Sequence, residues 1–157
     1  MSIAPVLIVG YGNPGRGDDA LGPELVARLE ALRALRPAWP RIEFLTDFQL
    51  APEHAVDVRG RALVLFVDAC HAGWRPVTLR RARARRDTTF TSHAMSPEAL
   101  LDACREAFGE PLPEAYVLEI AGTCFDAGAA LSSAAHDRLD VAVGLADDLL
   151  SGYRAAA

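Results

Sequence analysis

The sequence predicts an α/β fold, a three-layer α/β/α sandwich in which a twisted, mainly parallel five-stranded sheet lies between two layers of helices. Short apolar runs alternate with amphipathic stretches along the chain, which is typical of strands that alternate with helices. Two of these runs, residues 6–9 and 62–67, have no polar face. Strands of that kind are covered by helices on both faces of a sheet.

The first half of the chain supplies three strands and two helices. Gly22-Pro23-Glu24 starts a helix, because proline fits the first turn and a carboxylate there is stabilised by the helix dipole. Residues 41–45 are a plausible second strand, the apolar run 62–67 is a third, and Pro52 marks the start of a short helix. The expected elements are a strand at 6–9, a helix from Gly22, a strand at 41–45, a short helix at 52–58 and a strand at 62–67.

The second half supplies two more strands and two helices. Arginines roughly alternate with small or apolar residues in 77–85, which indicates a charged edge strand that discourages aggregation. Ser96 and Pro97 are typical of a helix N-terminus, and this helix, which directs Phe108 inward, ends at Gly109. The remaining elements are a strand at 116–120 and a helix at 133–153 with an apolar stripe.

Composition predicts one globular domain over residues 1–157. Of these residues 51% are hydrophobic, and the net charge of −5 includes sixteen basic residues that are all arginine. This charge disfavours a broad nucleic-acid-binding surface. The number of cysteines is odd, residues 1–9 do not have the pattern of a signal peptide, and no apolar run is long enough to predict a membrane span. We therefore expect a cytoplasmic monomer that contacts neither membrane nor nucleic acid.

Polar residues at three places are expected to meet at one edge of the sheet. Asp19 ends the glycine-rich loop after the first strand, Asp68 follows the third strand, and His93 precedes the helix at Ser96. Loops at the carboxyl ends of parallel strands share one edge of a sheet. Two carboxylates and an imidazole suit a divalent ion such as nickel, zinc or cadmium.

The glycine-rich loop also matches a dinucleotide-binding pattern, Gly-x-Gly-x-x-Gly, at Gly10, Gly12 and Gly15. In a dinucleotide site the helix N-terminus directly follows the third glycine and binds a pyrophosphate. Here Asp18 and Asp19 intervene and place negative charge where phosphates would lie. We therefore reject a nucleotide site.

Three motifs, in order along the chain, resemble those of the hydrogenase maturation endopeptidases. They are Gly10-x-Gly12-Asn13 with Gly17-Asp18-Asp19-x-x-Gly22, then Val67-Asp68-Ala69, then Thr91-Ser92-His93-Ala94-Met95-Ser96-Pro97. The resemblance implies an endopeptidase that removes a C-terminal extension from the nickel-loaded precursor of a nickel-iron hydrogenase large subunit. It also implies a twisted, mainly parallel sheet between helices.

The same resemblance assigns the site residues. Asp19, Asp68 and His93 match the family's metal-contacting positions, and Asp47 matches an acidic position after the second strand. Nickel is then supplied by the substrate, although zinc or cadmium could occupy the site in vitro. Residues 119–125 depart from the family pattern, which leaves open the class of hydrogenase that is processed.

Two alternatives remain open. The opening, residues 7–15, also resembles peptidyl-tRNA hydrolase, but the segment that should carry that enzyme's catalytic histidine has none before His54. A module that binds the nickel centre without cleaving it would use the same three residues as a protease. Cys70 and His71 are adjacent, so their side chains are expected to point apart, and His54 is expected to be a surface histidine.

Overall fold

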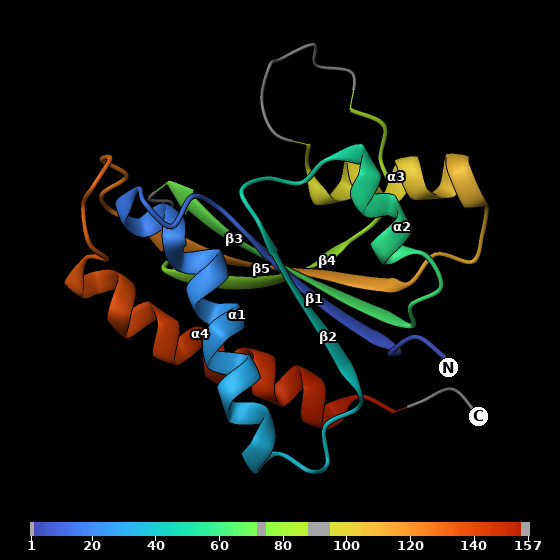
Figure 1. Cartoon of the computed structure of the whole chain (residues 1–157), viewed down its shortest axis with the longest axis horizontal. Coiled ribbons are helices and arrows are strands. Elements are labelled where there is room, and N and C mark those ends of the chain that lie inside the picture. The colour runs from blue at the N-terminus through green and yellow to red at the C-terminus, as the bar shows by residue number, and fades with distance from the viewer. Residues whose placement is uncertain (1, 72–74, 88–94, 155–157) are drawn as a thin grey trace.

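Five strands form a single twisted sheet in the computed structural model, which describes residues 2–71, 75–87 and 95–154 (Figure 1). The strand order is β2-β1-β3-β5-β4, and β4 is the one strand that runs antiparallel to its neighbour. The mainly parallel five-stranded sheet predicted from the sequence is therefore confirmed. The strands are β1 (Val6–Tyr11), β2 (Ile42–Asp47), β3 (Leu63–His71), β4 (Val77–Ala82) and β5 (Glu114–Gly122).

Helices cover both faces of this sheet, as Figure 1 shows. On one face lie α1 (Leu21–Leu32) and α4 (Ser133–Gly152), and on the other lie α2 (Ala55–Val58) and α3 (Pro97–Phe108). Three short 3-10 helices, η1 (Gly17–Ala20), η2 (Arg33–Leu35) and η3 (Pro52–His54), lie in the connections. Within the described ranges, no helix is long and apolar enough to cross a membrane.

The interior strand β1 contributes to both hydrophobic clusters, which lie on opposite faces of the sheet. All six of its residues are buried. Val6 and Ile8 pack in the cluster with α1 and α4, whereas Leu7 and Val9 pack in the cluster with α2 and α3. Side chains alternate between the two faces of a strand, so a strand buried on both faces must be apolar at every position. The absence of a polar face in residues 6–9 therefore predicted its central place correctly.

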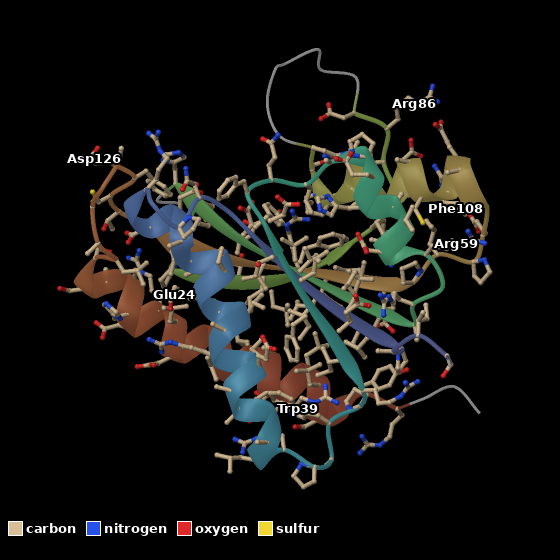
Figure 2. All side chains as sticks on the ribbon, viewed as in Figure 1. Glu24, Trp39, Arg59, Arg86, Phe108 and Asp126 are labelled. Carbon is tan, nitrogen blue, oxygen red and sulfur yellow. The ribbon has the colours of Figure 1, made fainter. Side chains whose placement is uncertain are left out.

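Some predicted boundaries and orientations differ from the structure. β3 continues to His71 because β5 pairs with it along its whole length, so Asp68 lies inside a strand instead of after one. Phe108 was expected to point inward but is 40% exposed. It is the last residue of α3, and its ring packs against the Arg59 guanidinium 4.5 Å away (Figure 2). A cation–π contact of this kind suits a ring at the edge of the core.

Two glycines explain why the loop after β1 needs its glycine-rich sequence. A Cβ on Gly10 would lie 2.4 Å from the Gly22 carbonyl oxygen, so α1 can approach β1 only when that Cβ is absent. Gly12 has a φ of +146°, and a Cβ there would lie 2.0 Å from the Asp19 carbonyl oxygen. These glycines let the loop fold tightly against the start of α1, and they place Asp19 beside the end of β1.

The buried carboxylate of Asp18 connects this loop to the loop between β5 and α4. Asp18 is 0% exposed. It accepts hydrogen bonds from the backbone N–H groups of Thr123 (2.7 Å), Cys124 (3.3 Å) and Ser132 (2.8 Å), and from the Ser132 hydroxyl (2.7 Å). Ser132 is also the N-cap of α4, where its hydroxyl oxygen accepts a bond from the Ala135 N–H. One carboxylate thus joins the loop after β1, the loop after β5 and the start of α4.

The charge of Asp18 is favoured by these donors. Burial opposes ionisation, but the hydrogen bonds from Ser132, Thr123 and Cys124 outweigh it and hold the pKa of Asp18 at about 2. An unfolded Asp has a pKa of 3.8. The folded state therefore binds fewer protons than the unfolded state between these values, and Asp18 stabilises the fold above about pH 4.

We expect Asp18→Asn to lower the free energy of unfolding at pH 7 by about 2–4 kcal/mol, because an amide NH2 would face N–H groups that need an acceptor. As the pH falls from about 4 to 2, the free energy of unfolding of the parent should decrease because Asp18 becomes protonated. The variant has no such carboxyl and should not show this decrease. Denaturant titrations at pH 7 and pH 3 measure both effects. Asp126→Asn, an exposed change close to the same loop (Figure 2), is the control and should be neutral; an equal loss in both variants would contradict the assigned role.

Candidate active site

A cleft of about 470 Å³ opens at the carboxyl edge of the sheet. Asp19 comes from η1, Asp68 from β3, Arg80 from β4, and Met95 and Glu98 from the start of α3. The cleft therefore lies where the loops after the parallel strands diverge, the usual place for a ligand in this kind of fold. The predicted convergence of Asp19 and Asp68 is found.

Asp19 is held at the cleft by the backbone of its own loop. The Asn13 N–H donates a 2.7 Å hydrogen bond to Asp19 Oδ2, and the close approach of Gly12 to the Asp19 carbonyl fixes the residue from the other side. Asp18 and Asp19 are neighbours, but Asp18 is fully buried and Asp19 is half-buried at the cleft. The two adjacent carboxylates therefore have separate roles, one in holding the loops and one at the site.

The surroundings of Asp68 disfavour the charged form of its carboxyl. It is paired in register with Glu119 of β5. Burial raises the pKa of Asp68 to about 7, the negative charges of Glu119 and Asp19 act in the same direction, and an interaction with the Tyr11 hydroxyl opposes them. A carboxyl with this pKa is partly protonated near neutral pH, so it can bind a cation or exchange a proton. Perturbed carboxyls in clefts are typical of functional sites.

Tyr11, the last residue of β1, lines the same cleft as Asp68. Its side chain is buried, and burial together with the Asp68 charge raises the pKa of its phenol far above the ordinary value. The hydroxyl and the Asp68 carboxyl influence each other's pKa, yet no hydrogen bond of regular geometry joins the hydroxyl to any described residue. Tyr11 is therefore a neutral, unpaired hydrogen-bond donor next to a candidate site carboxylate.

Arg80 balances part of the acidic charge in the cleft. Its guanidinium forms ion pairs with Glu98, in the first turn of α3, and with Glu119 of β5 at 2.7 Å. Partial burial works against the charge, but the two carboxylates raise the pKa of Arg80. From sequence, Arg80 is only one arginine of an edge strand. Arg80 lies on the same strand face as Ala82, which is buried in the core beside α3, and an arginine on that face indicates a charged partner.

Asp47 is not among the described residues that line this cleft. Its carboxylate accepts the Phe48 N–H at 2.7 Å and faces His54 Nε2 at 3.1 Å. The Ala51 N–H donates to His54 Nδ1 at 2.8 Å, so Nε2 carries the proton that is donated to Asp47. Asp47 thereby braces the turn that carries Phe48 and Gln49 to the cleft.

The prediction that His54 is a surface histidine is wrong, because only 7% of it is exposed. The predicted short helix begins with the 3-10 turn η3, and His54 is its last residue. This turn directs the ring back onto the end of β2, where it meets Asp47. An element this short carries too little periodicity to assign a buried face from sequence.

His93, the predicted third ligand, lies outside the described residues, and its place in the site stays a prediction. The described chain resumes at Met95, two positions later, and Met95 lines the cleft. Among the described residues, no group of three His, Cys, Asp or Glu side chains could hold a metal ion. The described part of the predicted ligand set is therefore the pair Asp19 and Asp68.

The Cys70 thiol shows no sign of nucleophilic activation. Cys70 lies on β3, where burial and then the charges of Glu119 and Asp68 raise the pKa of its thiol. The neighbouring His71 ring packs against Phe125, with ring centroids 4.4 Å apart. A thiol with a raised pKa is less ionised and so a weaker nucleophile at neutral pH, which argues against a nucleophilic role for Cys70.

We expect Asp68→Asn to stabilise the fold at pH 8 by about 2–4 kcal/mol, because about three pKa units separate the folded carboxyl from an unfolded one. The folded state binds more protons than the unfolded state between pH 3.8 and about 7, so the parent should lose stability as the pH rises through this window. The variant should not, and the two should be equally stable near pH 4. Denaturant titrations between pH 4 and 8 test this; a variant less stable than the parent at pH 8 would contradict the strained environment assigned to Asp68.

Comparison by sequence finds no match: no protein-family model and no curated protein sequence matches the chain. Comparison by structure does find similar proteins. The NiFe hydrogenase maturation protease HycI of Thermococcus kodakarensis KOD1 has a TM-score of 0.70 and 21% identity, over 95% of this chain and 94% of that one. The hydrogenase maturating endopeptidase HybD of E. coli has a TM-score of 0.70 and 20% identity, over 92% and 91%.

An endopeptidase from Escherichia coli, solved in solution, is also similar, with a TM-score of 0.71 and 20% identity over 95% of this chain and 94% of that one. Each similarity spans nearly the whole of both chains. Neither alternative, a peptidyl-tRNA hydrolase or a module that binds the nickel centre without cleaving it, gains support from these comparisons. The chain has the fold of the hydrogenase maturation proteases, as the resemblance of its three motifs implied.

Proposed function

We propose that this protein is an endopeptidase that removes a C-terminal extension from the nickel-loaded precursor of a nickel-iron hydrogenase large subunit, the last step in maturation of that subunit. The observation that carries the proposal is the meeting of Asp19 and Asp68 in one cleft. These are two of the three positions that the motif resemblance assigns to metal contact. The shared fold with proteins named as hydrogenase maturation proteases supports the same conclusion.

In this proposal the metal belongs to the substrate. Asp19, Asp68 and His93 supply two carboxylate oxygens and one imidazole nitrogen, which suit nickel and would also accept zinc or cadmium in vitro. Contact with the nickel centre distinguishes a loaded precursor from an unloaded one. A metal ion beside the scissile bond can polarise its carbonyl or lower the pKa of a bound water.

The chain's own residues prepare the cleft for this substrate. Asp19 is fixed by the Asn13 N–H, so one ligand is in place before the precursor binds. Asp68 exchanges its proton for the metal, because a cation displaces protons from its ligands. Arg80 ties Glu98 and Glu119 together, which limits the negative charge around Asp68. Asp47 supports the Phe48 turn and has an indirect role. We expect a cytoplasmic monomer to carry out this reaction.

The decisive experiment mixes the purified protein with a nickel-loaded precursor and, separately, with a nickel-free one. Mass spectrometry should detect a shortened subunit only in the nickel-loaded sample. Asp19→Asn and His93→Ala should reduce the cleavage rate by at least about 100-fold, since losing even a residue that only supports a metal ligand costs about 10–100-fold. Asp126→Asn is the matched control and should cleave at the parent rate.

Two results would contradict the proposal. A precursor with confirmed nickel that stays full-length with the parent protein would refute endopeptidase activity. If such a precursor still binds the parent, and binds Asp19→Asn more weakly, the protein is a binding module for the nickel centre. Equal cleavage of nickel-loaded and nickel-free precursors would instead refute recognition of the metal.

We also expect Cys70→Ser to cleave the nickel-loaded precursor at a rate within about twofold of the parent, since a raised thiol pKa does not suit a nucleophile. The rate is measured by mass spectrometry, with circular dichroism to verify folding. A folded Cys70→Ser variant that no longer cleaves would overturn the metal-centred mechanism.

A further inference from the structure

The Tyr11 hydroxyl is an exception to the way polar atoms are buried in this protein. The residue is 7% exposed, and its hydroxyl oxygen is the one buried side-chain polar atom without a hydrogen-bond partner in the described part of the chain. Buried tyrosine hydroxyls usually find a partner, and an unpaired one disfavours folding. A phenylalanine would fill the same space without that penalty, so a structural role alone does not account for the hydroxyl.

The surroundings of the hydroxyl indicate what it can bind. Tyr11 lines the cleft at the end of β1. The charged groups that act on it are three carboxyls, with Asp68 acting most strongly and Glu98 and Glu119 more weakly. Asp68 is also the nearest of the three by position. Gly10 and Val67 are paired in register, so Tyr11 and Asp68 are the next residues on adjacent strands, and both line the cleft.

The two site carboxylates differ in how they are held. Asp19 receives a backbone N–H from its own loop at 2.7 Å, so its orientation is set by the fold. Asp68 lies on β3 one residue beyond the last pair of that strand with β1. Besides the backbone N–H of Ala69, the donor that acts on its carboxylate is the Tyr11 hydroxyl. No hydrogen bond of regular geometry joins the Tyr11 hydroxyl to Asp68 or to any other described residue.

We propose that Tyr11 is a positioning residue for Asp68: its hydroxyl donates a hydrogen bond to the Asp68 carboxylate when that carboxylate contacts the metal of the substrate, and so fixes the carboxylate's orientation. This inference rests on the proposed endopeptidase function. A donor behind a metal-binding carboxylate orients it and is worth about 10–100-fold in metal affinity or activity. The hydroxyl then gains its partner on substrate binding, which offsets the penalty of leaving it unpaired in the free protein.

The test compares Tyr11→Phe, which removes only the hydroxyl, with the parent. We expect kcat/KM for the nickel-loaded precursor to fall about 10–100-fold, while the melting temperature stays equal to the parent's or rises because an unpaired buried group has been removed. Tyr116→Phe is the matched control. It removes a hydroxyl that donates to Glu114 at 2.6 Å, outside the cleft, and should leave kcat/KM unchanged.

The outcomes separate this inference from the proposed function. An unchanged kcat/KM for Tyr11→Phe, with the parent cleaving normally, overturns the positioning role and leaves the endopeptidase function standing. A fall in kcat/KM together with a lower melting temperature also overturns it, because the hydroxyl would then stabilise the fold itself. Absence of cleavage by the parent refutes the proposed function and this inference with it.

Discussion

The arrangement of the site depends on the buried carboxylate of Asp18. It binds backbone N–H groups from the loop after β5 and from the start of α4, and it belongs to the same 3-10 turn as Asp19. Loops at the edge of a sheet are ordinarily its most mobile parts. A fully buried, ionised acceptor for several donors holds two of them, the loop after β1 and the loop between β5 and α4, in one arrangement. The position of Asp19 relative to Asp68 follows from that arrangement.

Two groups in the cleft lower the stability of the fold. Burial and neighbouring carboxylates disfavour the charged form of Asp68, and the Tyr11 hydroxyl is buried without a regular partner. Sequences depart from the most stable choice chiefly at functional sites, where the rest of the fold compensates. Here the compensation lies close by, in the hydrogen bonds of Asp18 and in the two ion pairs of Arg80. The same edge of the sheet thus contains both the strained groups and the interactions that hold them.

The fold and the meeting of Asp19 and Asp68 could be predicted because they depend on local patterns. Runs without a polar face identified central strands, Ser96 and Pro97 located the start of α3, and the geometry of parallel strands brought Asp19 and Asp68 together. The rest depends on contacts between distant parts of the chain. Arg80 meets partners 18 and 39 residues away, and His54 is buried by a short turn that shows no periodicity. Pairings of this kind have no signature in a single sequence.

The glycine-rich loop shows how one pattern can meet different chemical requirements. In a dinucleotide site, glycines let the backbone approach a pyrophosphate. In this protein the missing Cβ atoms of Gly10 and Gly12 instead admit the carbonyl groups of Gly22 and Asp19, so the loop folds onto its own helix. The space that phosphates would need is filled by the chain, and an acidic side chain is directed to the cleft. The pattern therefore specifies a close approach of backbone at the end of β1, and the residues that follow it decide whether the site attracts an anion or a cation.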